Sequence, residues 1–188
     1  MIRFDNISAG YGRFAVIRDF SLAVEPGECI LLQGRNGSGK TTLMKTLAGL
    51  IPPLQGHLPD ADIVMVPTRI PKVKGFTVRE FLTLSSRQRD LTAVERAMQL
   101  LHITDLAERD LSTLSDGQFQ KACIATALSR RADLILLDEP TAFLDCENRI
   151  QVLAAIKEAA RKSGSPILFS SHDLPDARAV ADREIAIG

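Results

Sequence analysis

The order of apolar and polar positions along the chain predicts strands that alternate with helices. Continuous apolar runs, typical of parallel strands buried on both faces, occur at residues 29–32 and 134–137, and further strands are expected at the apolar residues 63–66 and at 166–171. Residues 2–7 and 20–24 instead alternate apolar and polar side chains, which predicts small antiparallel strands with one exposed face. A terminal strand is expected at residues 184–187. We therefore expect an α/β fold with a mainly parallel sheet.

Helices are expected at residues 42–48 and 148–162, and the pattern between residues 68 and 130 is helical throughout. Ser or Thr followed three residues later by Glu or Gln predicts three helix starts in that region. These pairs are Thr77 with Glu80, Thr92 with Glu95, and Ser115 with Gln118. The sequence thus predicts a core of residues 1–67 and 131–188, with a helical subdomain inserted at 68–130. Leu54 to Asp62 is expected to be a short polar connection.

Composition narrows the possible functions. The chain has 188 residues, with 23 basic and 23 acidic side chains, so nothing indicates the clustered basic surface of a general nucleic-acid binder. No apolar run approaches the ~20 residues of a membrane-spanning helix, and residues 1–6 lack the apolar region of a signal peptide, so we expect a cytoplasmic location. The scattered cysteines Cys29, Cys123 and Cys146 show no metal-binding spacing. Residues 87–96 mix acids with bases, which predicts a solvent-facing helix surface.

Residues 34–42 fit the phosphate-binding loop pattern G-x-x-x-x-G-K-[ST], between a predicted buried strand and a predicted helix. Backbone N–H groups of such a loop cradle the phosphates of a nucleotide. Lys40 would contact the β- and γ-phosphates, and the hydroxyl of Thr41 would contact Mg²⁺. The predicted nucleotide-binding residues of this loop are Gly34, Arg35, Asn36, Gly37, Ser38, Gly39, Lys40, Thr41 and Thr42.

Asp138 and Glu139 follow the apolar run at 134–137, where an open α/β sheet places its ligands. Asp138 would hold Mg²⁺, through a water molecule, and Glu139 would position and polarise the attacking water as a general base. Acidic residues also end strands for reasons of solubility, so this pair alone leaves both interpretations open.

Residues 114–118, Leu-Ser-Asp-Gly-Gln, resemble the signature sequence of ATP-binding cassette (ABC) proteins. Residues 137–145 are similar to the end of the family's Walker B motif and its D-loop, and residues 170–173 resemble its switch-histidine segment, so the resemblance covers nearly the whole chain. The resemblance implies a P-loop NTPase core. It also implies roles for residues outside the phosphate loop. His172 would bond the γ-phosphate, Tyr11 would stack on adenine, Asp145 would lie in the D-loop that crosses to a partner, and the signature would contact the partner's ATP through Ser115, Gly117 and Gln118.

Family resemblance further implies an ATP-hydrolysing subunit that uses ATP and Mg²⁺. Such a subunit works as a homodimer or paired cassette and powers a separate transmembrane permease, contacted around residues 68–82. It would lie on the inner face of the cell membrane through that permease, without inserting into the membrane. The motifs are most similar to those of importers of iron–siderophore, haem or cobalamin complexes. Neither the cargo nor the direction of transport is indicated by the sequence.

Two departures from the family pattern stand out: Thr68 occupies the position of the Q-loop glutamine, and Asp116 replaces the commoner signature glycine. Two other functions remain open. A non-transport ABC ATPase acting on a soluble target would usually carry two cassettes or long insertions. A nucleotide-sensing module with weak hydrolysis would fit Thr68, but Lys40, Glu139 and His172 are intact.

Overall fold

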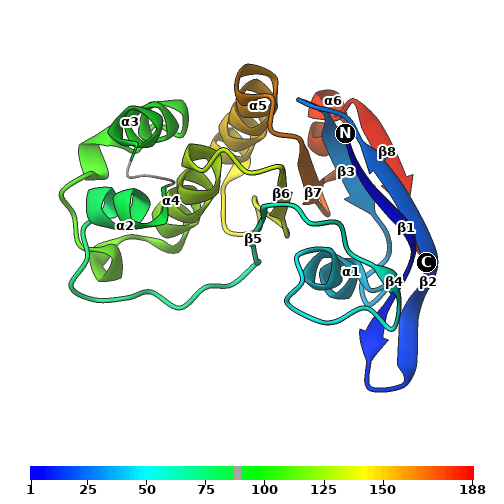
Figure 1. Cartoon of the computed structure of the whole chain (residues 1–188). Coiled ribbons are helices and arrows are strands. Elements are labelled where there is room, and N and C mark those ends of the chain that lie inside the picture. The colour runs from blue at the N-terminus through cyan, green and yellow to red at the C-terminus, as the bar shows by residue number, and fades with distance from the viewer. Residues whose placement is uncertain (87–89) are drawn as a thin grey trace.

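A computed structural model describes residues 1–86 and 90–188. At its centre lies a five-stranded parallel sheet in the order β5-β6-β7-β3-β8 (Figure 1). The strands are β3 (Cys29–Gln33), β5 (Ile63–Val66), β6 (Leu134–Leu137), β7 (Ile167–Ser170) and β8 (Arg183–Ala186). Both β6 and β7 are buried along their whole length. The predicted parallel sheet is confirmed, and its strand at 134–137 is buried on both faces as expected.

A second, antiparallel sheet has the order β2-β1-β4. It contains β1 (Ile2–Tyr11), β2 (Phe14–Val24) and β4 (Gln55–His57). The connection at 54–62, expected only as a short polar segment, contains the three-residue strand β4, which pairs with β1 through Asp5 opposite His57. A Cβ atom on Gly56 would lie only 2.8 Å from the carbonyl oxygen of Asn6, so glycine permits this close pairing.

Six α-helices accompany the sheets within the described residues. They are α1 (Lys40–Leu47), α2 (Val78–Ser85), α3 (Leu91–Leu100), α4 (Asp116–Ser129), α5 (Cys146–Ser163) and α6 (Leu174–Val180). Short 3-10 turns at Thr104–Leu106 and Leu111–Thr113 connect α3 to α4. The sequence did not predict α6, a seven-residue helix with a proline in its first turn. None of the helices that the structure describes is long and apolar enough to cross a membrane.

Two of the three predicted helix starts are confirmed as capping boxes, at Thr77 with Glu80 and at Ser115 with Gln118. The third was wrong, because α3 begins at Leu91 and its cap is Asp90, whose carboxylate accepts a hydrogen bond from the Ala93 N–H. Part of the prediction for residues 87–96 falls on 87–89, which lie outside the described residues.

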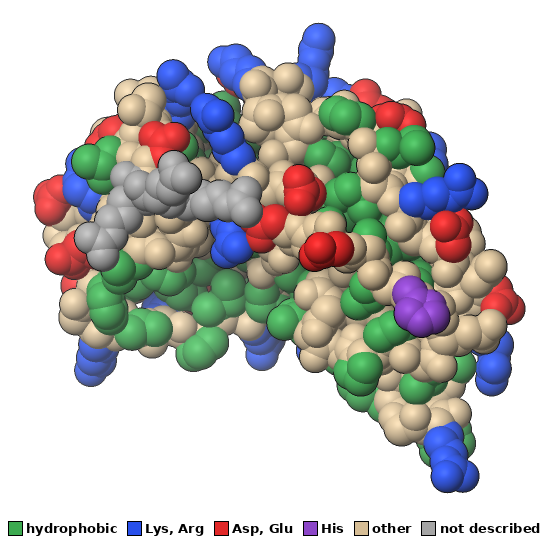
Figure 2. Space-filling model, in the orientation of Figure 1, with side chains coloured by type: hydrophobic (Ala, Val, Ile, Leu, Met, Phe, Trp, Pro, Cys, Tyr) green, Lys and Arg blue, Asp and Glu red, His purple; other side chains and the backbone are tan. Residues whose placement is uncertain are grey.

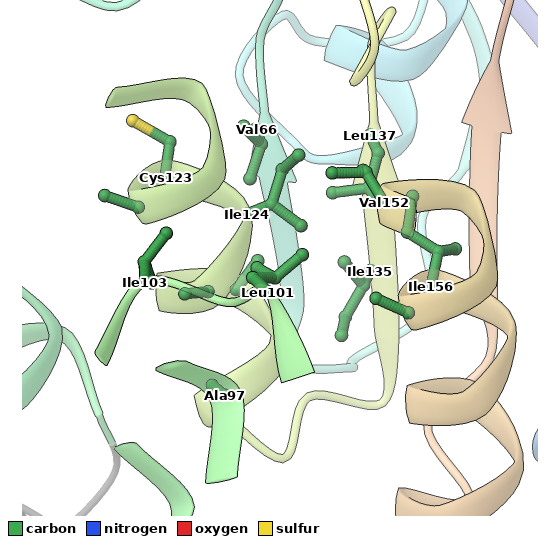
Figure 3. Packing of buried hydrophobic residues seen from close by; sticks show 14 of the residues in the cluster. Val66, Ala97, Leu101, Ile103, Cys123, Ile124, Ile135, Leu137, Val152 and Ile156 are labelled. Carbon is green, nitrogen blue, oxygen red and sulfur yellow. The ribbon is translucent and has the colours of Figure 1, made fainter. Parts of the chain in front are cut away.

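Alternate side chains of the parallel sheet pack into two different apolar clusters. Ile135 and Leu137 of β6 face α4 and α5, where they meet Ile124 and Val152 (Figure 3). Leu134 and Leu136 face the opposite side, where α1 and the antiparallel sheet cover them. In Figure 1, α2 and α3 lie beyond α4, on the far side of α4 from the sheets. The first cluster runs unbroken from the sheet through α4 to these helices, so the division of the chain into core and subdomain stays a prediction.

Candidate active site

The glycine-rich loop connects the end of β3 to the start of α1. Gly39 is the residue before α1 and has a φ of +100°, in the left-handed region that favours glycine. A Cβ atom there would lie 2.6 Å from Cγ1 of Val16, so the loop also packs closely against β2. No side chain caps α1, which leaves the first N–H groups of the helix available to an anion.

Lys40 folds back over this loop. Its ammonium group donates hydrogen bonds to the carbonyl oxygens of Gly34, at 2.7 Å, and Arg35, at 3.3 Å, and the residue is 7% exposed. Within the described part of the chain, the hydroxyl of Ser38 is buried without a hydrogen-bond partner. A buried positive charge and an unpaired hydroxyl beside free N–H groups suit a phosphate group, which would supply the missing acceptor.

Asp138 follows β6 and is the most enclosed carboxylate of the site, with 1% exposure. Three hydroxyl groups donate to it from three separate parts of the chain. Thr41 and Thr68 reach Oδ2 at 2.7 and 3.0 Å, and Ser170 reaches Oδ1 at 2.9 Å. Such hydrogen bonding allows a carboxylate to remain buried. Thr68, at the position of the missing glutamine, therefore contacts the same carboxylate as Thr41.

Glu139 has a backbone conformation that is rare for a residue with a side chain. Its φ is +54°, and its N–H donates to the hydroxyl of Ser170 at 3.0 Å. Its carboxylate lies 2.6 Å from Nε2 of His172. Burial raises the pKa of Glu139, which the neighbouring His172 and Lys40 partly oppose. A half-buried carboxylate held in a strained conformation beside an imidazole has the character of a general base.

Ser115, Gly117, Gln118 and Asp145 form a second group around the starts of α4 and α5. Ser115 and Gln118 bond each other in the capping box, so the Gln118 N–H already donates to the Ser115 hydroxyl. A Cβ atom on Gly117 would lie 3.2 Å from the carbonyl oxygen of Phe143, which brings the signature against the segment that precedes α5. Asp145 caps α5, and its hydrogen bonds to Asn148 lower its pKa.

Tyr11 lies at the tip of the hairpin between β1 and β2, directly opposite Phe14. Both aromatic rings are largely exposed, with relative accessibilities of 54% for Tyr11 and 84% for Phe14. Because the same hairpin packs on Gly39 through Val16, Tyr11 belongs to an element that borders the phosphate loop. Sequence reasoning gave no role to Phe14.

Several interactions of the site were not expected from the sequence. The hydroxyl of Ser170 joins Asp138 to the Glu139 N–H, and Thr68 donates to Asp138. Lys72 forms an ion pair with Asp116 at 2.7 Å. In the sequence, the residues that make these interactions share only one property: each lies within a few residues of a predicted strand end or helix start. That property is too general to single them out.

Oxygen ligands suit Mg²⁺. Thr41 and Asp138 place a hydroxyl and a carboxylate in contact beside the phosphate loop. Across residues 1–86 and 90–188, no group of three His, Cys, Asp or Glu could hold a metal ion by itself. The donors therefore fit a magnesium ion that phosphate oxygens also bind, and they do not form an all-protein metal site.

Acidic and basic side chains are interspersed over the face of the molecule seen in Figure 2.

Comparison with known proteins places these features in context. A family model described as "ABC transporter" matches residues 17–142. The chain is 36% identical to the zinc import ATP-binding protein ZnuC of Jannaschia sp. (strain CCS1), covering 100% of this chain and 79% of that protein. It is 33% identical to the probable siderophore transport system ATP-binding protein YusV of Bacillus subtilis (strain 168), covering 99% and 76%.

Solved structures with the same arrangement include a putative metal-chelate type ABC transporter in an inward-facing conformation. Its TM-score is 0.85 at 26% identity, and the match covers 100% of this chain and 79% of that one. An archaeal ribosome recycling factor, aABCE1, in complex with the ribosomal stalk protein aP1, has a TM-score of 0.85 at 33% identity. The match covers 99% of this chain but only 36% of that protein.

Proposed function

This chain belongs to the ABC transporter family and is an ATP-binding subunit with ATPase activity. We propose that it forms a dimer in which the phosphate loop of each subunit faces the signature of the partner. In the proposed dimer, Ser115, Gly117 and Gln118 of one subunit contact the ATP bound by the other. The support is that Ser115 opens a 14-residue helix whose first N–H groups can face an anion. Tyr11 would stack on the adenine, and Asp145 would lie at the contact between subunits.

We propose that Glu139 is the general base of ATP hydrolysis. Its carboxylate would accept a proton from the attacking water, and burial supports this because a raised pKa makes the carboxylate a better proton acceptor. His172, whose imidazole contacts the Glu139 carboxylate in this structure, would contact the γ-phosphate. The Lys40 ammonium, which donates to backbone carbonyl oxygens, would donate to phosphate oxygens instead. These residues bind and orient the reactants, which is most of what phosphoryl transfer requires.

Thr41 and Asp138 would hold Mg²⁺, with Asp138 acting through a water molecule. The metal supplies charge neutralisation at the β- and γ-phosphates when it is bound. The chain's own contribution is the ordering of these two oxygen donors. Thr68 and Ser170 hydrogen-bond to the Asp138 carboxylate, so its orientation is fixed before any ligand arrives.

We propose that the membrane partner is a permease that docks around residues 68–82, which would hold the subunit at the inner membrane face. Val73 and Phe76 support this, because both are apolar and substantially exposed there, at 46% and 39%. The transport system would import a metal ion or a metal chelate. This proposal follows the relatives whose names state zinc import and siderophore transport.

The observation that carries the proposed chemistry is the convergence of Thr41, Asp138, Glu139 and His172 at the ends of parallel strands. Glu139→Gln keeps the shape of the side chain but removes the base. We expect this variant to lose ATP turnover and to accumulate ATP-bound dimers, measured by phosphate release and by analytical ultracentrifugation. The matched control is Glu158→Gln, since Glu158 is an exposed residue of α5 that pairs with Lys162. Parent-like phosphate release by Glu139→Gln would remove Glu139 from this role.

A soluble target is the second candidate function, favoured by the similarity to the ribosome recycling factor. That protein is about three times as long as the matched region, whereas the zinc import and siderophore transport relatives are matched over more than three quarters of their length. Co-purification from detergent-solubilised membranes separates the two. Recovery with a membrane permease supports transport, and recovery with ribosomes supports the alternative.

A further inference from the structure

Lys72 contacts the start of α4 at three points. Its ammonium group lies 2.7 Å from Oδ1 of Asp116 and donates to the carbonyl oxygen of Leu114 at 2.8 Å. It also lies 6.0 Å from the centre of the Phe119 ring, within the range of a cation–π interaction. Leu114 precedes the cap, Asp116 is the first helical residue, and Phe119 is one turn further on, so Lys72 brackets the cap residue Ser115.

The charges around this helix start depend on Lys72. The backbone at a helix N-terminus carries about half a positive charge, which attracts anions. The carboxylate of Asp116 alone would reverse that sign and leave about half a negative charge, whereas the ammonium of Lys72 restores the original value. Lys72 also lowers the pKa of Asp116 through its hydrogen bond, so the acid stays ionised and paired.

The ion pair also anchors the segment on which Lys72 lies. Residues 67–76 form neither helix nor strand. Within this segment Thr68 donates to Asp138, and the guanidinium of Arg69 lies 5.9 Å from the centre of the Phe143 ring. Lys72 therefore joins a segment that touches the subunit's own Asp138 to the helix that begins with the signature.

We propose that Lys72 is a positioning residue of the signature, which holds and neutralises the Asp116 carboxylate at the start of α4 so that a phosphate can approach it. The inference rests on the proposed dimer, because that phosphate belongs to the ATP of the partner subunit. Asp116 departs from the commoner glycine, and Lys72 is the compensating residue that makes the acid compatible with an anionic ligand.

The test is a double-mutant cycle of Lys72→Met and Asp116→Gly in the Glu139→Gln background, in which ATP-bound dimers accumulate. Sedimentation at saturating ATP gives the dimer dissociation constant. Removing the compensating charge should weaken each signature contact roughly two- to fivefold, the range of helix-terminus and exposed ion-pair effects. Because each dimer uses two signatures, Lys72→Met should raise the dissociation constant about 4- to 25-fold. Higher salt should reduce this difference.

Asp116→Gly added to Lys72→Met should restore the dissociation constant to within about twofold of the background value, because no acid remains to be neutralised. Lys74→Met is the matched control, since Lys74 is an exposed lysine of the same segment, and it should leave dimerisation unchanged. A Lys72→Met effect that Asp116→Gly fails to restore, or no effect at all, overturns the inference. Failure of the Glu139→Gln background itself to dimerise with ATP would instead refute the proposed dimer.

Discussion

Ser170 is the residue whose loss should reveal how the site is held together. Its hydroxyl is fully buried, donates to Oδ1 of Asp138 at 2.9 Å, and accepts the N–H of Glu139 at 3.0 Å. Ser170→Ala removes one atom and both hydrogen bonds, and leaves the fold of β7 unchanged. It deprives a buried carboxylate of a donor and a strained backbone N–H of its acceptor.

The expected cost follows from the kinds of hydrogen bond that are lost. A bond to a charged group contributes about 1.5–3 kcal/mol, and a neutral one about 0.5–1.5 kcal/mol. Ser170→Ala should therefore lower the free energy of unfolding by about 2–4.5 kcal/mol. Ser171→Ala is a matched control: within the described residues the hydroxyl of that buried neighbour accepts a single backbone hydrogen bond, from the Asp173 N–H, and its loss should cost about 0.5–1.5 kcal/mol.

Urea denaturation of the parent and both variants, followed by circular dichroism, measures the difference. The slope of free energy against urea should be unchanged if only native-state interactions are lost. We also expect Ser170→Ala to lose ATP turnover more than Ser171→Ala, because the Glu139 N–H is no longer held. A Ser170→Ala variant as stable as Ser171→Ala would refute the idea that this hydroxyl stabilises the buried carboxylate.

Two further predictions concern ionisable groups. Burial raises the pKa of Glu139, so its ionised form destabilises the folded state as pH rises through that pKa. Glu139→Gln should therefore have a higher free energy of unfolding than the parent at pH 8, and the difference should shrink toward about pH 4, where the unfolded glutamate also binds its proton. Urea denaturation of both proteins across this pH range measures the difference. A difference that does not vary with pH contradicts the prediction. Burial also raises the pKa of the Cys29 and Cys123 thiols to about 12, whereas Cys146 is exposed. Mass spectrometry after maleimide treatment of the native protein at pH 7.5 should find a label on Cys146 alone, and labelling of either buried cysteine would argue against this packing.

The features that sequence predicted well are those encoded locally. Apolar runs gave the strands of the parallel sheet, and the run at 134–137 lies wholly buried as β6. The phosphate loop could be placed because its glycines and Lys40 form a contiguous motif. By contrast, β4 has only three residues and is a strand because Gly56 allows close pairing with β1, a contact about 50 residues distant along the chain. No local pattern signals such a partner.

The same distinction applies within the site. Asp138 was predicted from its position after a strand, but its three hydroxyl donors could not be. Thr41, Thr68 and Ser170 come from the start of α1, the segment after β5 and the end of β7, and only the strand order of the sheet brings them together. The misplaced start of α3 has another cause, because Asp90 and Thr92 are both good capping residues and only the observed backbone distinguishes them.

The segment at residues 67–76 has a consequence for how such a subunit can evolve. Since it forms neither helix nor strand, its path is set largely by individual side chains such as Thr68, Arg69 and Lys72. A substitution at one of these positions would alter its path while the two apolar clusters stay intact. Because Thr68 also holds Asp138 and Lys72 also pairs with Asp116 of the signature, such a substitution would alter the ATP site together with the docking segment. Natural selection would therefore have to adapt the segment to a new membrane partner and preserve ATP hydrolysis in the same steps.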